Sequence, residues 1–522
     1  MKKQTHLSCF MALMLLLVTG GCATLPDNLG REASTAYVDT HDTRIGRHVQ
    51  AEMAEHPGES GYLLLGNGLD AFVARVLLAQ RAERSIDTQY YMIHDDVVGS
   101  LFVDQLYKAA ERGVRVRLLV DDMDQEGRDT GAAILDSHPN VEVRIFNPFA
   151  RNVGRIRQYV SGFGKQTRRA HNKSFTVDNQ ATILGGRNIG DEYFEADPDL
   201  AFVDLDVLAV GPVAGQVSAS FDQYWNSALS YPISTLAENP PTPEETTQRK
   251  KVFDEFIAGQ VDSEYLQHLR DSDLANRIRQ DRVTYHWGVG AVVADDPEKL
   301  THDTAETKFH LSEQLAPYMA DIRQELIIFS PYFVPGKAGV AFFQQLRDRG
   351  VQVKILTNSL ASTDVGIVHA GYARYRHALL RMGVELYELN RNLSREERKA
   401  IKKGVIGQSK SSLHAKCFLL DRETAFIGSL NLDPRSIIQN TEIGVVLKST
   451  AIAGHIADGF DRQIEKVAFR LELKKSPNGT ERLVWHGIVD GEKQTFDHEP
   501  YTGFWKRFGV GFMRMLPIES QI

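Results

Sequence analysis

The chain has 522 residues, of which 42% are hydrophobic and 25% are charged, close to the usage of ordinary globular proteins. This length is enough for roughly three domains, or for two large α/β units. The formal net charge of −8 excludes the global basic field expected of a nonspecific nuclease, so an anionic partner must be met by local basic patches.

The first residues have the pattern of a secretory signal. Met1-Lys2-Lys3 is followed by an apolar run over residues 10–18 that is too short for a membrane span. The run ends in Thr19-Gly20-Gly21-Cys22, which resembles a bacterial lipoprotein signal over residues 1–22. The resemblance implies that Cys22 receives a lipid and anchors the chain in the bacterial cell envelope, facing the periplasm. Ala23 favours the outer over the inner membrane, and ordinary signal cleavage near the same place is the alternative.

Residues 23–60 are polar and contain prolines, which predicts a tether. The first folded unit, residues 61–230, alternates helical and strand-like patterns, with a helix stop at Gly113. Strands separated by helices predict parallel pairing in an α/β fold. The expected elements are a helix over 69–79, a strand over 85–91, a helix over 99–112 and a strand over 114–120.

The second half of the chain repeats this order. Residues 231–282 hold four prolines followed by a charged helical stretch, which predicts a linker with a helical insertion. The second unit, residues 283–475, is followed by a C-terminal extension over 476–522. Its expected elements are a strand over 326–332, a helix over 340–349 and a strand over 351–356. We therefore expect two similar α/β domains with mixed, largely parallel sheets flanked by helices.

Two later segments are unusual in composition. Residues 391–410 hold seven Lys or Arg and are either a solvated loop or a lip that meets anionic headgroups. Near the C-terminus, an apolar helical face with basic residues beside it suits an interfacial helix on a membrane surface. Docking of that face on the protein's own core is the alternative, and two glycines weaken the helix prediction. The apolar residues are Phe504, Phe508, Phe512 and Met515, and the basic ones are Lys506, Arg507 and Arg514.

One short motif occurs twice. His171-Asn-Lys173 is followed by Asp178, and His414-Ala-Lys416 is followed by Asp421 at the same spacing. In an extended segment, residues two apart point to the same face, so each copy sets an imidazole beside an ammonium that can neutralise a phosphate. Each lysine would repel a metal cation, and no carboxylate or cysteine ligand cluster accompanies the histidines, so we expect neither a metal nor a cofactor.

The duplicated motif resembles that of the phospholipase D superfamily, and nearly all of the chain after residue 63 is similar to the bacterial cardiolipin synthases of the C type. The softer features of this resemblance are Arg168–Phe175, Phe202–Val207, Asn440–Gly444 and Leu516–Ser520. It implies two phospholipase D-type domains that form one pseudo-two-fold active site, with a single phosphate between His171 and His414.

The resemblance also implies roles for individual residues. His171 would attack phosphorus and form a phosphohistidine, and His414 would serve as acid and then base; the sequence itself is symmetric on this point. The groups implied to donate to the phosphate oxygens are Lys173, Lys416, Asn188 and Asn431, with Ser429 as a further hydroxyl.

Acidic partners are expected to hold the imidazoles. Glu442 matches the family's acidic residue after the second motif, and Asp204 is the best match after the first, with Asp206 as the fallback. By strand parity Asp178 and Asp421 point away from His and Lys, so we expect them to bond nearby turns. Arg168 and Arg169 are candidates for a second phosphate or an anionic acceptor, and the surface alternative stays open. Cys417 is expected to be a small core residue.

Three activities are compatible with such a site. The first is phosphatidyl transfer from a phospholipid, phosphatidylethanolamine in the family, to phosphatidylglycerol, which makes cardiolipin. The second is hydrolysis of the same intermediate to phosphatidic acid, and the third is a nuclease, which the acidity of the chain and its lipoprotein-like N-terminus oppose. We expect phospholipid substrates and a membrane surface as partners, and no nucleic acid; a lipoprotein that only binds lipid would leave the duplicated His and Lys without a role.

Overall fold

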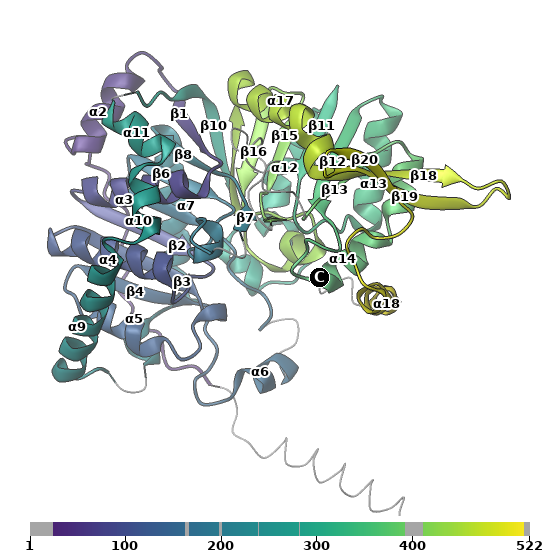
Figure 1. Cartoon of the computed structure of the whole chain (residues 1–522). Helices are drawn as coiled ribbons and strands as arrows, with labels where there is room; N and C mark the ends of the chain where they lie inside the picture. Colours follow the sequence, from purple (N-terminus) through teal and green to yellow (C-terminus); the bar gives the residue numbers. More distant parts are fainter. Residues whose placement is uncertain are drawn as a thin grey trace, which may run out of the picture.

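The computed structural model of the chain describes residues 24–161, 166–197, 201–237, 240–280, 282–391 and 411–515. The expected signal with Cys22, the basic stretch after Arg391 and the last seven residues lie outside this part of the chain. The described residues form two halves of similar architecture that stand side by side (Figure 1).

The first half is built on a sheet with the strand order β4-β3-β2-β5-β6-β8-β1. Its β2–β3 and β3–β4 pairs are parallel because α4 and α5 cross between them, and its other pairs are antiparallel. The elements are β1 Ser60–Leu65, α3 Gly68–Arg81, β2 Ser85–Tyr90, α4 Val97–Glu111, β3 Arg115–Asp121, α5 Asp129–Asp136, β4 Val141–Phe146, α6 Arg155–Ser161, β5 Ser174–Val177, β6 Ala181–Gly185, β7 Ala201–Val203, β8 Asp206–Val210, α7 Pro212–Asn226 and β9 Ser230–Pro232.

The second half repeats this sheet in the order β13-β12-β11-β15-β16-β17-β10. Its elements are β10 His286–Ala294, α12 Leu311–Ala320, β11 Glu325–Phe329, α13 Gly336–Asp348, β12 Gln352–Asn358, α14 Gly366–Ala373, α15 Arg376–Arg381, β13 Glu385–Leu389, β14 Ser411–Leu413, β15 Cys417–Leu420, β16 Thr424–Gly428, β17 Ile443–Lys448 and α17 Thr450–Val467. The sheets are mixed as expected, but antiparallel pairs outnumber parallel ones. The reason is that the strands after each motif, β5–β6 and β15–β16, are joined by tight turns.

The halves meet along two seams. β1 pairs antiparallel with β10, with Gly61 opposite Trp287, which makes the two sheets continuous. β7 pairs parallel with β14, with Val203 opposite Leu413, and Figure 1 shows β7 between the halves. A hydrophobic core is shared across the interface by β6, β8 and α7 of the first half and β16, β17 and α17 of the second. β1 meets its equivalent β10, and the β7–β14 pairing has its counterpart in the parallel bridge between Ala170 and Thr441, so the halves are related by a pseudo-two-fold axis.

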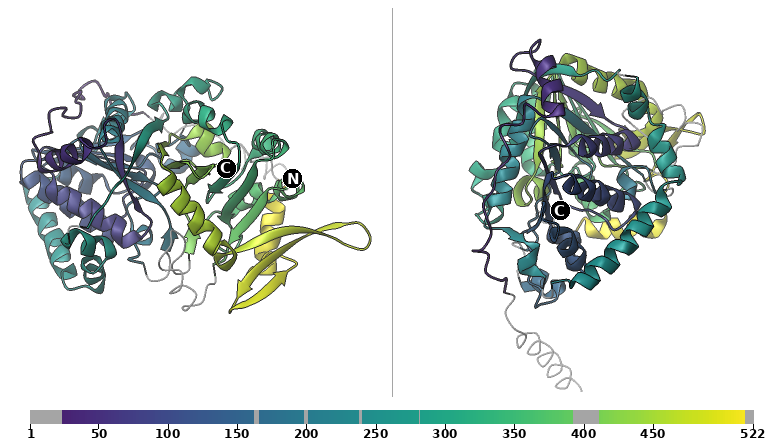
Figure 2. Two further views of the ribbon diagram at one scale, coloured as in Figure 1. Left: turned by 90° about the horizontal axis from the view of Figure 1, so that it is seen from above. Right: turned by 90° about the vertical axis from the view of Figure 1, so that its left-hand side faces the viewer.

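The insertion between the halves is helical and packs on the first half. Its helices are α8 Ile233–Leu236, α9 Pro243–Gln260, α10 Glu264–Arg270 and α11 Asp273–Arg279. Leu269, Leu274 and Ala275 join the core of the first half, whereas α9 buries no residue. Figure 2 shows these helices along the outer side of that half. The insertion therefore adds an outer layer that lies away from the interface.

The segment before β1 is not the tether that its composition suggested. Residues 44–53 form α2 (Arg44–Met53), and the chain before α2 runs along the first half. Arg117 and Trp225 both bond to Ser34, and Arg144 donates to the carbonyl of Glu32. Buried arginines need acceptors, and the polar N-terminal segment supplies backbone and hydroxyl oxygens to them.

The C-terminal extension begins later than the composition suggested. β18 Ala468–Lys475 pairs with β13 and forms a hairpin with β19 Glu481–Val489, to which β20 Glu492–Phe496 is added. Residue 476 therefore lies in a turn of the second half's sheet, and the hairpin projects from the molecule (Figure 2). The last helix among the described residues is α18, Phe504–Met513.

Candidate active site

Each motif histidine is held by the backbone of the opposite half. His171 N donates to the carbonyl of Thr441 at 2.8 Å, and His414 N donates to the carbonyl of Val203 at 2.8 Å. The side-chain amide of Asn172 adds a contact, because its oxygen accepts from the Thr441 hydroxyl at 2.8 Å. Both histidines therefore lie on the interface between the halves.

The two acidic partners are exchanged between the halves. His171 Nδ1 lies 2.9 Å from the carboxylate of Glu442, and His414 Nδ1 lies 2.6 Å from the carboxylate of Asp204. Each histidine is thus oriented by an acid that belongs to the other repeat. The fallback residue Asp206 accepts instead from Arg75 at 2.8 Å, inside the first half.

These carboxylates fix the tautomer of each ring. A carboxylate accepts a hydrogen bond, so Nδ1 of each imidazole carries a proton, and Nε2 is the nitrogen left to react or to exchange a proton with a ligand. Lys416 Nζ also lies 3.0 Å from His414 Nδ1, but a protonated Nδ1 cannot accept from an ammonium. The bond that Lys416 makes is therefore the one to the carbonyl of His414.

The two imidazoles lie within reach of each other's charge. Burial, followed by the charges of Lys173, Lys416 and His414, holds the pKa of His171 well below its ordinary value. Burial and the charge of Lys416 also lower the pKa of His414, although Asp204 opposes this effect. Charges from both repeats act on each ring, so the two motifs form one electrostatic site.

The two motif lysines are buried at the same place. Lys173 Nζ donates to the carbonyl of His171 at 2.7 Å. Burial lowers the pKa of Lys173 to about 7 and that of Lys416 to about 8, while the carboxylates of Glu442 and Asp204 act in the opposite direction. A buried ammonium regains stability when an anion enters, so the site is built to attract a phosphate.

The two asparagines expected to face the phosphate are buried and lie beside hydroxyl groups. The side-chain amide of Asn188 lies 2.8 Å from the Tyr193 hydroxyl, and that of Asn431 lies 3.4 Å from the Ser436 hydroxyl. The amide oxygen of each asparagine is buried without a partner. Because a hydroxyl can also donate, turning either amide over would satisfy the oxygen and release the NH₂ as a donor.

Ser429 supports an acidic partner. Its hydroxyl donates to the carboxylate of Glu442 and accepts from the backbone N–H of Ile443 at 3.0 Å. The expected contact with substrate is replaced by one with the acid that holds His171. Gly186 occupies the corresponding position of the first half.

Neither Arg168 nor Arg169 has the open setting expected of a second phosphate site. The guanidinium of Arg169 is fully buried over the ring of Phe149 and donates to the carbonyls of Asn147 and Gln166. Arg168 donates to the carbonyl of His302 at 2.7 Å. These arginines tie the loop before the first motif to its surroundings, because backbone carbonyls there need donors.

The motif aspartates bind turns. Asp178 accepts from the backbone N–H groups of residues 83–85, and Asp421 accepts from those of residues 323–325. Asp178 itself has a φ of 51° and Asp421 a φ of 52°, which short acidic side chains tolerate in tight turns. Cys417 is buried in the shared core, and burial raises the pKa of its thiol.

The sequence analysis gave no role at the site to several residues around the imidazoles, although Phe202 begins one of the softer features of the resemblance. The ring of Tyr91 lies 5.1 Å from that of His171, and the rings of Tyr193 and Phe202 lie 5.2 and 5.1 Å from that of His414. These three rings surround the imidazoles with largely apolar surface. Their spacing in the sequence does not indicate this position. Arg435 adds positive charge near His171; its place four residues after Asn431 is the signal that could have found it.

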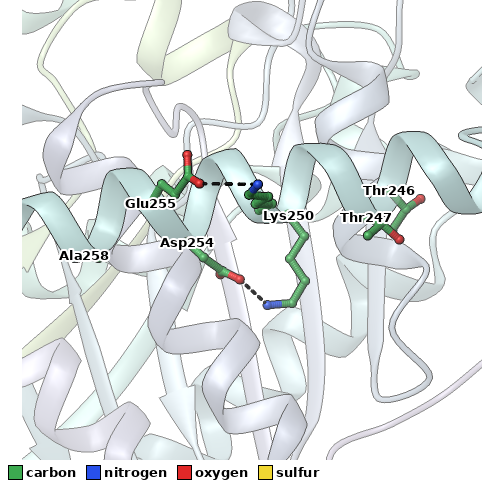
Figure 3. A pocket seen from close by; sticks show the side chains of 7 residues that line it. Thr246, Thr247, Lys250, Asp254, Glu255 and Ala258 are labelled. Atoms are coloured by element: carbon green, nitrogen blue, oxygen red, sulfur yellow. Dashed lines mark hydrogen bonds and ion pairs between the residues drawn. The ribbon is translucent and has the colours of Figure 1, made fainter.

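A surface depression along α9 has no link to this chemistry. It is lined by α9 side chains, with Lys250 paired to Asp254 at 2.8 Å and Lys251 to Glu255 at 3.9 Å (Figure 3). Ion pairs of this kind, four residues apart on a solvated helix, are ordinary surface features. Among the described residues, no helix is long and apolar enough to cross a membrane.

Two buried His-Lys pairs, each oriented by the other repeat's acid, define a two-motif site of the phospholipase D class. The comparisons with known proteins place the chain more narrowly. It belongs to the family described as "Cardiolipin synthase, PLD-like domain", whose profile matches residues 77–225 and again residues 317–464. The resemblance inferred from the sequence is thereby confirmed, and the chain is an enzyme of the phosphatidyltransferase or phospholipase D type.

Individual relatives agree with this placement. The chain is 40% identical to cardiolipin synthase C of Escherichia coli K12 over 91% of its own length and 99% of the relative's. It is 26% identical to cardiolipin synthase A of Pseudomonas aeruginosa PAO1, over 80% of this chain and 70% of that protein. A crystal structure of phosphatidylserine synthase from Haemophilus influenzae Rd KW20 has the same fold, with a TM-score of 0.54, 11% identity, and coverage of 90% and 98%.

Proposed function

We propose that this enzyme makes cardiolipin by transferring a phosphatidyl group from one phospholipid, phosphatidylethanolamine, to phosphatidylglycerol through a phosphohistidine. The observation that carries the proposal is the exchange of acids at the interface, which sets His171 and His414 into one electrostatic site. A single phosphodiester can then meet two imidazoles from opposite sides, as a double displacement requires.

In the first step, His171 Nε2 attacks phosphorus and the bond from phosphorus to the headgroup oxygen breaks. His414 gives its Nε2 proton to the departing alkoxide. In the second step, a glycerol hydroxyl of phosphatidylglycerol attacks phosphorus while its proton passes to His414, and the bond from phosphorus to nitrogen breaks. The released His171 and the reprotonated His414 are ready for another cycle.

The acids support this division of roles. Burial raises the pKa of Glu442 to about 7, so His171 faces a weakly anionic partner and stays a neutral nucleophile. The pKa of Asp204 is held below its ordinary value, because the charges of His414 and Lys416 outweigh the effect of burial. An ionised Asp204 favours the protonated form of His414, which a general acid needs.

The remaining polar groups are proposed to stabilise the phosphoryl oxygens. Lys173 and Lys416 would become fully charged when the phosphate binds, and the NH₂ groups of Asn188 and Asn431 would donate once their amides turn. Charge builds on the nonbridging oxygens in the transition state, so donors already held in a buried site gain most at that point.

Three incubations with lipid test transfer against hydrolysis. The purified protein is incubated with labelled phosphatidylethanolamine alone, with phosphatidylglycerol alone, and with both. We expect labelled cardiolipin to be the main product of the mixture, with turnover unchanged by a chelator. If phosphatidic acid accumulates and cardiolipin forms in no mixture, hydrolysis is the reaction and the synthase proposal is wrong.

The lipid anchor is a further part of the proposal. Lipidation at Cys22 would hold the chain on the periplasmic side of the cell envelope, at the outer membrane. Its support is the signal-like sequence before residue 23. Labelled fatty acid should enter the parent chain and not the Cys22→Ser variant, and fractionation should place the label in the outer membrane; equal labelling of both chains would remove the anchor.

A further inference from the structure

The last helix of the described chain turns a row of aromatic side chains outwards. Phe504 is 63% exposed, Trp505 79%, Phe508 60% and Phe512 54%. Of the seven exposed aromatic side chains among the described residues, these four lie within nine positions, and the rings of Phe504, Trp505 and Phe508 contact one another. A soluble protein seldom exposes such a cluster without a partner for it.

The opposite side of α18 is anchored in the second half. Val510 is 6% exposed and packs with Leu360 and Ala370, beside Met513. Turns of about 100° per residue place Val510 opposite the arc that holds the four aromatic residues. The helix therefore packs against the second half through the side that holds Val510. The alternative, in which the aromatic face covers the protein's own core, is wrong.

The chain just before α18 is also fixed. Glu499 accepts from Arg376 at 2.6 Å and lies 3.3 Å from His369. Arg376 and His369 are buried residues of the second half. Because α18 follows this buried ion pair closely, its aromatic face is presented in a defined direction.

A single loop, which follows β12, connects α18 to the residues beside His414. Asn358, at the end of β12, exchanges two hydrogen bonds of 2.9 Å with Leu413, the residue before His414. Two residues further on, Leu360 packs against Val510 of α18. Figure 1 shows α18 beside α14, the helix that this loop enters. A bilayer that meets α18 would thus lie near the His414 side of the active site.

Positive charge accompanies the aromatic face. Lys506 and Arg514 are exposed, and Arg507 is half-buried. Burial and the charge of Arg391 lower the pKa of Lys506, so Arg391 adds a further cation beside the helix. Aromatic rings flanked by basic side chains are the composition of helices that lie in the headgroup region of anionic bilayers.

We propose that α18 is a bilayer-docking helix, which inserts Phe504, Trp505, Phe508 and Phe512 into a phospholipid surface containing anionic lipid. This inference rests on the proposed function in one respect: the substrates are membrane phospholipids, so the helix brings the active site to the surface that holds them. The basic side chains pair with anionic headgroups, and the anchored Val510 side keeps the loop before His414 above the bilayer.

The test compares two matched sets of exposed apolar residues in the full chain. Both variants and the parent carry Cys22→Ala, so that no lipid anchor contributes. One variant is Phe504→Gln, Trp505→Gln, Phe508→Gln. The control is Val252→Gln, Phe256→Gln, Val261→Gln, on α9 and the residue that caps its C-terminal end, whose side chains are 40–55% exposed. Flotation with phosphatidylglycerol–phosphatidylethanolamine vesicles should weaken at least about thirtyfold in the first variant and stay at the parent level in the control.

A fluorescence measurement locates the contact. Trp505 is the most exposed tryptophan, whereas Trp225 and Trp485 are buried. Vesicles of bromine-labelled lipid should quench the parent, and the Trp505→Phe variant should keep its vesicle binding and lose most of the quenching. A parent that does not float with vesicles, or an α18 variant that floats as well as the control, overturns the proposal.

Activity on short-chain monomeric lipid separates this inference from the proposed function. The α18 variant should turn over monomeric substrate at the parent rate and lose activity only on vesicles. If the parent binds vesicles through α18 but turns over no lipid in either form, docking stands and the proposed function fails. If the variant loses both activities equally, α18 acts on the site itself and docking is not its role.

Discussion

The two halves present the same imidazole and ammonium with different acids. In the first half, Gly186 leaves room for the short Asp204, because a Cβ at residue 186 would lie 2.1 Å from the Asp204 carboxylate. In the second half, Ser429 fills that position and its hydroxyl supports the longer Glu442. The two halves thus repeat the same backbone arrangement but differ in the residue that packs against the acid.

This difference between the acids suits the two histidines to different roles. The pKa of Asp204 is lowered by neighbouring cations against the effect of burial, whereas burial raises the pKa of Glu442 to about 7. A double displacement needs one neutral nucleophile and one proton donor at the same time. The comparison teaches that a pseudo-symmetric site can divide these roles through its acidic partners while both motifs stay the same.

Removing either histidine is expected to have the largest effect. His171→Ala and His414→Ala should each lower kcat by at least about 10⁴-fold, because each ring takes part in both steps. His138→Ala, whose ring packs on Tyr107 in the first half, serves as the control. With a labelled phosphatidyl substrate bearing a nitrophenyl group, His414→Ala should still trap label as phosphohistidine, and His171→Ala should trap none. The opposite trapping pattern would reverse the assignment of the nucleophile.

The acids are expected to rank next. Asp204→Asn and Glu442→Gln should each lower kcat about 10²- to 10⁴-fold, since an amide cannot hold the charged ring. A nitrophenyl leaving group needs no acid, so the first-turnover burst of nitrophenolate should largely recover in Asp204→Asn and not in Glu442→Gln. Equal recovery in both variants would mean that the two halves are chemically alike.

The third prediction concerns the two residues that pack against the acids, Gly186 beside Asp204 and Ser429 beside Glu442. Gly186→Ala should displace Asp204 from His414 and lower kcat about 100-fold, because a displacement near 1 Å is enough for such a loss. Ser429→Ala removes one hydrogen bond to Glu442 and should lower kcat only about fivefold. Steady-state rates on mixed vesicles measure both. A larger loss from Ser429→Ala than from Gly186→Ala would show that the acid geometry is not what separates the halves.

Much of this arrangement could be predicted from the sequence. The helix and strand order and both motifs follow from periodicity and from the internal repeat. Gly113 is predicted to stop a helix, and Gly350 follows the helix over 340–349 at the same place in the second repeat. Their φ values of 89° and 84° show why glycine ends each helix. Asp178 and Asp421 could be assigned to turns by strand parity alone, because an odd step along a strand reverses the side chain.

The exchange of acids could not be predicted in this way. The distance along the chain from His414 to Glu442 is the same whether the acid meets its own histidine or the other one, so only the interface decides. The N-terminal segment misled for a similar reason, since its polar composition suits solvent as well as buried arginines such as Arg117. The direction in which α18 turns its aromatic side also depends on Val510 and its partners in the second half.

The smallest expected effect is on stability, and it has opposite signs for the two acids. Glu442 has a pKa of 4.5 when unfolded and about 7 when folded, so its contribution to stability is present below pH 4.5 and is lost as the pH rises through about 7. Asp204 has a folded pKa below its unfolded value of 3.8, so its contribution is present above about pH 4 and is lost in acid.

Melting temperatures at pH 5 and pH 8 read out this difference. Relative to the parent, Glu442→Gln should be more stable at pH 8 than at pH 5 by at least about 1 kcal/mol, because the amide has no charge to bury at high pH. Asp204→Asn should be destabilised by a similar amount at both pH values, since the parent's carboxylate is ionised throughout that range. The difference between the two pH values cancels the hydrogen bonds lost in each variant. A shift of the same sign and size for both acids would show that the two halves bury their carboxylates in equivalent surroundings.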